Sequence, residues 1–290
     1  MLRKIRILLA AFTFIVLTLL FLDFTGTIHL WLGWMAKIQF LPALLAVNAG
    51  VVAALVLLTL LFGRIYCSVI CPLGILQDLI SWFAGRGQKK PRFRFQKAHT
   101  FMRYAFLVLF IVLLAAGFGQ IAALIAPYST FGRIVGTLLN PIYAWGNNCL
   151  AYLAERVGSY AFYRVDVWVK GTVTLLVASL TLMILAFSAA SHGRLWCNAV
   201  CPVGTLLGLV SRFAFFKPVF DLQKCNGCGI CSRKCKAECI DPALHQIDLS
   251  RCVACYDCVE ACRQKAISIG LCNKTKQEVP NETSQEAEND

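Results

Sequence analysis

Four runs of this chain are long enough and apolar enough to cross a lipid bilayer. A spanning helix needs roughly 20 consecutive apolar residues. The runs cover residues 7–22, 40–62, 104–126 and 171–191, and none of them contains a charged side chain. No small-x-small cleavage site follows the first run, so we expect it to be a retained helix rather than a signal peptide. The pattern predicts an all-α membrane bundle of four transmembrane helices.

The net charge of +13 is concentrated beside these runs. Positive residues flank the cytoplasmic ends of membrane helices. We therefore expect both termini and the loop 63–103 to lie on the cytoplasmic side of a bacterial inner membrane. Anionic lipid headgroups account for such a basic loop, and we expect no nucleic-acid partner. The residues concerned are Arg3, Lys4, Arg6, Arg64, Arg86, Lys89, Lys90, Arg92, Arg94, Lys97 and Arg103.

The membrane part contains one segment twice. Residues 63–83 (GRIYCSVICPLGILQDLISWF) align without gaps with residues 193–213 (GRLWCNAVCPVGTLLGLVSRF). Each copy follows an apolar run and carries a CxxxCP motif, and Pro72 and Pro202 are expected to start a helix. Two halves that enter the membrane from the same side are parallel repeats, related by a pseudo-twofold axis along the membrane normal. The two motifs should then face each other at the cytoplasmic surface.

The loop between the third and fourth runs is ambiguous. Residues 134–154 are uncharged, but Asn140-Pro141 and Gly146-Asn147-Asn148 interrupt them. A fifth span would place the two CxxxCP motifs on opposite sides of the membrane. We therefore expect an interfacial or re-entrant segment here.

The chain holds fifteen cysteines, and nearly all fall in the segments that we expect in the cytoplasm. Structural disulfides are rare there, so metal or redox use is expected. Residues 225–235 and 252–262 both follow the pattern C-x2-C-x2-C-x3-C. In such pairs the fourth cysteine, expected at the start of a helix, ligates the other cluster. One 4Fe–4S cluster is therefore predicted on Cys225, Cys228, Cys231 and Cys262, and a second on Cys252, Cys255, Cys258 and Cys235.

Three further cysteines fall outside both the cluster motifs and the CxxxCP motifs. Cys239 could replace Cys235 as a ligand, although its spacing fits the pattern less well. Cys149 and Cys272 each stand alone and are expected to be inert thiols. Zinc knuckles, the main alternative to clusters, would use two CxxC pairs for each metal, which the eight-cysteine repeat does not fit.

These motifs resemble those of the bacterial 2×4Fe–4S ferredoxins, which implies a small α+β domain. The proline that follows the fourth cysteine in that family is replaced here by Lys236 and Arg263. Their positive charge could raise the cluster potentials, because local charge is one of the tuning factors. We expect a membrane domain over 1–217, a ferredoxin-like domain over 218–272 and a disordered acidic tail over 273–290.

The CxxxCP cysteines Cys67, Cys71, Cys197 and Cys201 have two interpretations. If the parallel repeat brings them together, four thiols could hold a third iron–sulfur centre or another soft metal. Otherwise they pack as small buried apolar side chains. Arg64 and Arg194, which open each motif, could contact an anionic headgroup or a semiquinone, or could snorkel at the membrane edge. His29 and His192 are assigned no role.

Taken together, the GRxxCxxxCPxG motifs, the four runs and the double cysteine motif resemble the NapH-type membrane ferredoxins. These belong with NosR and CcoG proteins to a wider polyferredoxin group. The resemblance implies quinol oxidation, with electrons passed from the quinone pool through two 4Fe–4S clusters to a partner redox protein. The alternatives are a metal-handling or assembly factor of the CcoG or NosR type that uses the CxxxCP cysteines, and a docking domain that the clusters merely brace.

Overall fold

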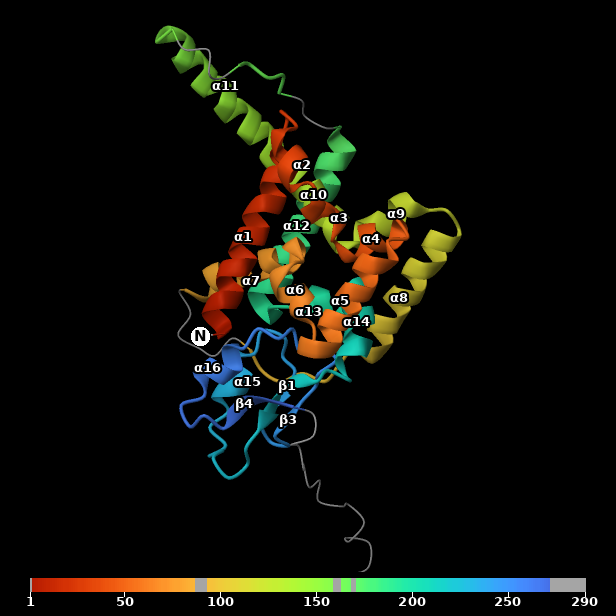
Figure 1. The fold of residues 1–290 in the computed structure, drawn as a ribbon, viewed down its shortest axis with the longest axis vertical. Coiled ribbons are helices and arrows are strands. Elements are labelled where there is room, and N and C mark those ends of the chain that lie inside the picture. Colours follow the sequence, from red (N-terminus) through yellow and green to blue (C-terminus); the bar gives the residue numbers. More distant parts are fainter. Residues whose placement is uncertain (1, 87–92, 159–162, 168–170, 272–290) are drawn as a thin grey trace, which may run out of the picture.

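The computed structural model describes residues 2–86, 93–158, 163–167 and 171–271. The predicted tail over 273–290, Cys272, and Lys89, Lys90 and Arg92 of the basic loop lie outside these residues. The described chain forms a mostly helical part that carries a small mixed module at one end (Figure 1).

Two helices of the described chain are long and apolar enough to cross a membrane on their own. They are α1 (Leu2–Leu22) and α12 (Thr172–His192), each of 21 residues, or about 31 Å of helix. Large apolar side chains project outward from both, such as Leu8 on α1 and Phe187 on α12. Apolar surface of this kind is typical of a membrane interface.

The second and third apolar runs are not continuous helices, in contrast to the expectation. Residues 40–62 form α4 (Phe40–Leu45) and α5 (Ala49–Phe62), with the break at Val47, whose φ is 53°. The Asn48 side chain then caps α5 by accepting the Val51 amide at 3.3 Å. Residues 104–126 divide between α8 (Thr100–Ala115) and α9 (Gly119–Ile125), with Gly117 at φ 80° between them.

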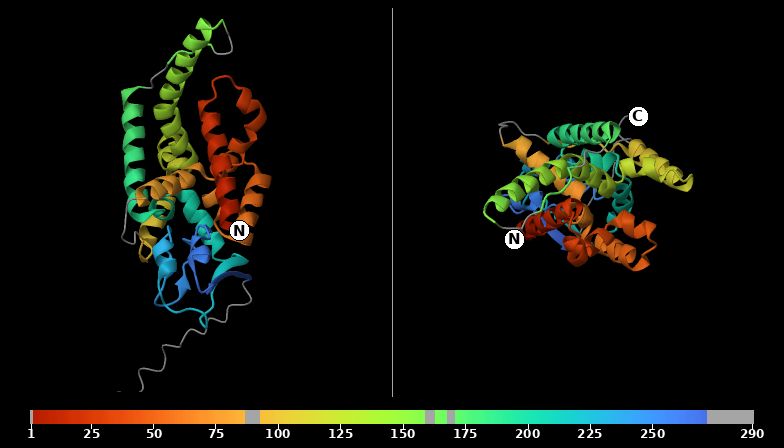
Figure 2. Two further views of the ribbon diagram at one scale, coloured as in Figure 1. Left: turned by 90° about the vertical axis from the view of Figure 1, so that its left-hand side faces the viewer. Right: turned by 90° about the horizontal axis from the view of Figure 1, so that it is seen from above.

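The segment after α9 is helical throughout, which corrects the expectation that Asn140-Pro141 and Gly146-Asn147-Asn148 interrupt it. It comprises α10 (Pro127–Ile134), a π-helical turn η1 (Val135–Leu139) and α11 (Asn140–Arg156). Pro141 has no backbone N–H and cannot donate the hydrogen bond of a regular helix. The wider π-helical turn just before it lets the helix continue past the proline. The run meets α9 at an angle of 83°, so the pair is a broken span or a re-entrant loop. Figure 2 shows the run between α1 and α12, and η1 packs against both.

The two segments that carry CxxxCP motifs fold alike. A glycine of positive φ ends α5 and α12, namely Gly63 (71°) and Gly193 (60°). A short helix follows, α6 (Ile65–Val69) or α13 (Leu195–Ala199). Pro72 then starts α7 (Pro72–Gly85) and Pro202 starts α14 (Pro202–Ser211), as predicted. The packing is crossed, because α7 lies against α12 and α14 lies against α5.

Two short antiparallel sheets and two short helices build the module. Strand β1 (Phe216–Phe220) pairs with β4 (Ile267–Leu271), and β2 (Ile240–Asp241) pairs with β3 (Gln246–Ile247). The helices are α15 (Ile230–Lys234) and α16 (Asp257–Ala261). The remaining short helices, α2 (Thr27–Leu32) and α3 (Trp34–Lys37), follow the end of α1 that lies away from the module (Figure 1).

Candidate metal centres

In the module, the first three cysteines of each motif line a pocket together with the fourth cysteine of the other motif. One pocket is lined by Cys225, Cys228, Cys231 and Cys262, and the other by Cys235, Cys252, Cys255 and Cys258. No charged side chain lines either pocket. These groups contain the cysteines of the two predicted ligand sets. The ligation itself stays a prediction.

The two cysteine loops share an unusual backbone that suits a bulky inorganic group. Gly227 and Gly229 have φ values of 68° and 64°, and the matching residues Ala254 and Tyr256 have 49° and 59°. A non-glycine residue in this left-handed region costs about 1–2 kcal/mol, and such strain gathers where the chain is shaped for function. The four thiols of each pocket are the donor set of a 4Fe–4S cluster, so the residues fit that group.

Two further observations refine the sequence interpretation of this module. Cys235 and Cys262 follow the last residues of α15 and α16, so each fourth cysteine ends a helix instead of starting one. Within the described residues, no three His, Cys, Asp or Glu side chains are placed to hold a single metal ion. A cubane is larger than one ion and holds its four cysteines farther apart.

Cys239 lines the second pocket as a fifth thiol. Its Sγ lies 3.5 Å from the Sγ of Cys235, and the residue is 1% exposed. The sequence holds one signal that points to it: four residues after the last cysteine of a motif, the first motif has Cys239 and the second has Ala266.

The four CxxxCP cysteines are buried, and each is at most 3% exposed. They lie close enough together for charges on their sulfur atoms to interact. Their surroundings supply hydrogen-bond donors to sulfur. The Gln77 side-chain nitrogen lies 3.4 Å from the Cys197 Sγ, and the Gly204 amide lies 3.4 Å from the Cys201 Sγ. The structure therefore brings the two motifs together in the interior.

The arginine that opens each motif reaches into the other motif. Arg64 donates from Nη2 to the carbonyl oxygen of Cys197 at 3.1 Å, and Arg194 donates from Nη1 to the carbonyl oxygen of Cys67 at 2.5 Å. Both arginines are 0% exposed. This position excludes both the snorkelling and the headgroup contact considered from the sequence, because neither guanidinium reaches the surface.

A glycine three residues after the second cysteine of each CxxxCP motif makes room for these arginines. A Cβ on Gly204 would lie 2.2 Å from the Cys197 carbonyl oxygen and 2.8 Å from Arg64 Nη2. A Cβ on Gly74 would lie 2.3 Å from the Cys67 carbonyl oxygen and 2.7 Å from Arg194 Nη1. The glycine of CPxG is thus explained by the close approach of a backbone carbonyl oxygen and of the opposite arginine.

Both arginines also connect the membrane part to the module. Arg64 Nη1 donates to Asn198 Oδ1 at 2.7 Å and to the carbonyl oxygen of Ser250 at 3.0 Å. Arg194 pairs with Asp78, whose Oδ2 also lies 3.7 Å from Nζ of Lys236. Burial by itself would raise the pKa of Asp78, but Arg194 and Lys236 outweigh burial and hold that pKa well below its ordinary range.

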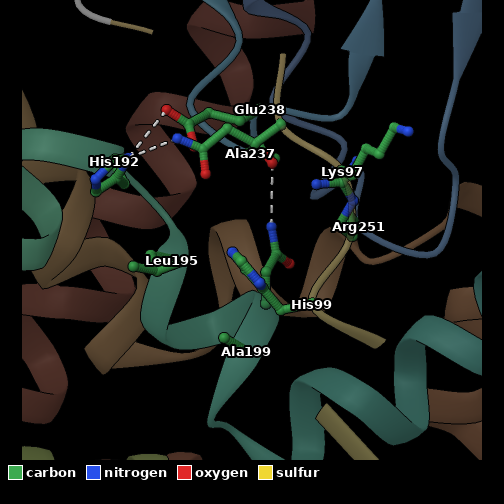
Figure 3. Close-up of a pocket in the computed structure, with 10 residues that line it drawn as sticks. Lys97, His99, His192, Leu195, Ala199, Ala237, Glu238 and Arg251 are labelled. Atoms are coloured by element: carbon green, nitrogen blue, oxygen red, sulfur yellow. Dashed lines mark hydrogen bonds and ion pairs between the residues drawn. The ribbon is translucent and has the colours of Figure 1, made fainter. Parts of the chain in front are cut away.

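A small polar pocket marks the same junction. Figure 3 shows His192 at the end of α12 facing Glu238 of the module, with 3.5 Å between Nδ1 and Oε1. Gln96 Nε2 lies 3.3 Å from the same histidine nitrogen, and Asn198 donates to the Ala237 carbonyl oxygen at 3.3 Å. His192 therefore joins the two parts of the protein. His29 lies apart from all these groups, 3.5 Å from Asp23.

Comparison with protein families finds 4Fe–4S binding domains in three segments. One family model of that description matches residues 44–91 and 173–222, and a second matches residues 245–268. The first model therefore covers both CxxxCP motifs, and the second covers the second cysteine motif of the module.

Several curated proteins are similar to this chain. The ferredoxin-type protein NapH of Escherichia coli is 29% identical over 67% of the chain and 55% of NapH. The methylamine utilization ferredoxin-type protein MauN of Paracoccus denitrificans is 29% identical over 63% of the chain and 52% of MauN. The regulatory protein NosR of Stutzerimonas stutzeri is 24% identical over 64% of the chain and 22% of NosR.

The matched part of the chain spans about half the length of NapH and MauN. No solved structure matches the chain. The matched segment 245–268 contains Cys252, Cys255, Cys258 and Cys262, which line the two cysteine pockets of the module. The chain is a homologue of the ferredoxin-type NapH proteins and belongs with them among the proteins that carry 4Fe–4S binding domains.

Proposed function

We propose that this protein passes electrons between the quinone pool of a bacterial inner membrane and a partner redox protein through two 4Fe–4S clusters. The chain supplies eight thiolate ligands in the crossed sets of the module pockets. The clusters, when bound, supply the electron transfer, and the protein holds and tunes them. The names of NapH and MauN, both ferredoxin-type proteins, support this role.

We call the pocket of Cys235, Cys252, Cys255 and Cys258 the inner pocket, and that of Cys225, Cys228, Cys231 and Cys262 the outer pocket. The observation that carries the proposal is the position of Arg64 between the CxxxCP cysteines and the inner pocket. Its guanidinium lies 3.9 Å from the Cys67 Sγ and 3.0 Å from the carbonyl oxygen of Ser250, two residues before Cys252. The backbone of the other half makes a similar contact, because the Arg194 amide donates to the Lys236 carbonyl oxygen at 2.9 Å. Buried thiols in the interior thus adjoin the module through direct protein contacts.

We further propose that the four CxxxCP cysteines hold a third centre, an iron–sulfur cluster or another soft metal, where electrons enter. The match of one 4Fe–4S family model to both motif segments supports this, as does the crossed contact of the two arginines. Cationic guanidinium groups beside the thiols would stabilise the thiolates that such a centre needs.

The proposed topology has four membrane crossings, formed by α1, α4–α5, α8–α9 and α12 as two parallel repeats, with both termini in the cytoplasm. The contact between Arg3 at the start of α1 and Asp257 of the module, 2.7 Å from Nε to Oδ1, supports a common side for the N-terminus and the module. The crossed packing of α7 on α12 and α14 on α5 supports the repeat. We keep the division between residues 217 and 218 as a proposal; it falls inside β1 (Phe216–Phe220), the first strand of the module.

The proposed third centre is tested by replacing Cys67, Cys71, Cys197 and Cys201 together by Ser in the full chain. Wild-type protein should carry about eight irons in the module plus the metal of the third site, and a quinol should reduce the clusters under anaerobic conditions. The variant should hold less metal, and its clusters should respond to dithionite but not to the quinol. Cys149→Ser, at an exposed cysteine, is the matched control and should behave as wild type.

Two results would contradict parts of this proposal. Unchanged metal content and unchanged quinol reduction in the fourfold variant would leave the CxxxCP cysteines only a packing role. Clusters of the wild type that accept electrons from dithionite and never from a quinol would remove the quinone pool as partner.

A further inference from the structure

We propose that Cys239 tunes the inner cluster by donating a hydrogen bond from its thiol to the ligand sulfur atom of Cys235, which raises the reduction potential of that cluster. The proposal rests on the ligand assignment of the proposed function. Cys239 is a positioning residue in this account, because it acts through the ligands and not on iron itself.

The geometry around Cys239 supports such a bond. Its Sγ lies 3.5 Å from the Cys235 Sγ, and it lines the inner pocket beside Cys235 and Cys252. The residue is 1% exposed, so water does not compete for the thiol. The Asp248 amide donates to the Cys239 carbonyl oxygen at 2.9 Å and fixes the backbone at this point.

The chemistry of the cluster decides which sulfur donates. A cysteine that ligates iron is a thiolate and carries no proton, so Cys235 and Cys252 can only accept. Cys239 then holds the S–H of this group of three sulfurs. A hydrogen bond to a ligand sulfur stabilises the reduced cluster, which carries more negative charge, and hydrogen bonds of this kind are among the factors that set cluster potentials.

The second motif provides an internal comparison. Ala266 occupies the position equivalent to Cys239, and its amide lies 3.3 Å from the Cys262 Sγ. The outer pocket therefore lacks a thiol donor at this position. The inner pocket lies next to the membrane part, as the bond from the Arg194 amide to Lys236 shows. The extra donor would thus make the membrane-proximal cluster the better acceptor of electrons that arrive from the bilayer.

The test is a redox titration of the full-length protein, followed by electron paramagnetic resonance under anaerobic conditions. Cys239→Ala, which copies the second motif, should keep the iron content of wild type and lower one cluster potential while the other stays unchanged. Cys239→Ser retains a donor and should fall between Cys239→Ala and wild type. Ala266→Cys, the reciprocal variant, should raise the potential of the outer cluster.

Other outcomes would overturn the inference. Loss of about four irons and of one cluster signal in Cys239→Ala would make Cys239 a ligand, and unchanged potentials would show that its thiol donates no such bond. Both are distinguishable from failure of the proposed function. If the proposed function fails, the wild type itself lacks two 4Fe–4S signals before any substitution is made.

Discussion

Asp78 and Arg194 form a two-pronged ion pair between the two halves of the membrane part. The Arg194 Nε lies 2.9 Å from Oδ1 of Asp78, and Nη2 lies 2.8 Å from Oδ2. This planar fork is the strongest arrangement that a guanidinium and a carboxylate make. Arg194 is 0% exposed, and the Asp78 side chain is 15% exposed. Since α7 supplies the acid and the start of α13 supplies the base, the pair holds the two CxxxCP motifs together.

Replacing Asp78 by Asn should destabilise the protein strongly, because the buried guanidinium of Arg194 would lose its counter-charge. Breaking one partner of a buried ion pair costs about 3–5 kcal/mol. Denaturant unfolding of the purified protein in detergent measures this change. Glu155→Gln is the matched control, since its pair with Arg164 is exposed on both sides and should contribute less than about 1 kcal/mol. Equal effects of the two substitutions would contradict the structural role of Asp78.

Gly204→Ala and Gly74→Ala should each lower stability, because the new methyl group would meet a backbone carbonyl and the arginine of the other half. Forcing extra volume into a packed interior costs about 1–3 kcal/mol. Gly146→Ala serves as the control, because a Cβ there meets nothing within 4 Å inside α11. That variant should be neutral or slightly more stable. A thermal melt of the three variants side by side would reveal the contrast, and similar melting temperatures would rule it out.

Local signals in the sequence predict part of this architecture well. Uninterrupted apolar residues predict α1 and α12, and prolines just after the CxxxC cysteines predict the starts of α7 and α14. These features depend on residues close together in the chain. The spacing of the module cysteines is equally local, and the structure places Cys262 in the pocket of the first motif.

Features that depend on residues far apart in the chain cannot be predicted from local sequence patterns. Hydropathy does not register the breaks at Val47 and Gly117, because both lie in apolar sequence. The burial of Arg64 depends on Asn198 and Ser250, more than 130 residues away. An arginine at the end of an apolar run ordinarily indicates a membrane edge, and only the tertiary contacts show that this one lies inside.

The topology can be tested with reporter fusions, because each half should enter the membrane from the cytoplasm. A reporter after Asp290 should give a cytoplasmic signal. One inserted after Gly158, where α11 has ended at the far end of the molecule from the module, should give a periplasmic signal. Matching signals from both sites, or a periplasmic signal after Asp290, would contradict the proposed orientation.

Replacing Cys262 by Ser should damage the cluster built on Cys225, Cys228 and Cys231 and leave the other cluster largely intact. The reason is that Cys262 lies in the pocket of the first motif although it belongs to the second. Cys262 gives a cleaner test than Cys235, because Cys239 stands beside Cys235 as a spare thiol, whereas Ala266 holds the equivalent position near Cys262.

Iron content and electron paramagnetic resonance measure the outcome for Cys262→Ser. The iron content should fall by up to about four atoms, the content of one cubane, and one of two cluster signals should weaken. Cys258→Ser should remove the other signal, because Cys258 lies in the inner pocket. If Cys262→Ser and Cys258→Ser instead abolish the same signal, the second motif supplies all four ligands of one cluster. The crossed arrangement would then be wrong, and the shared pockets would reflect packing of the loops alone.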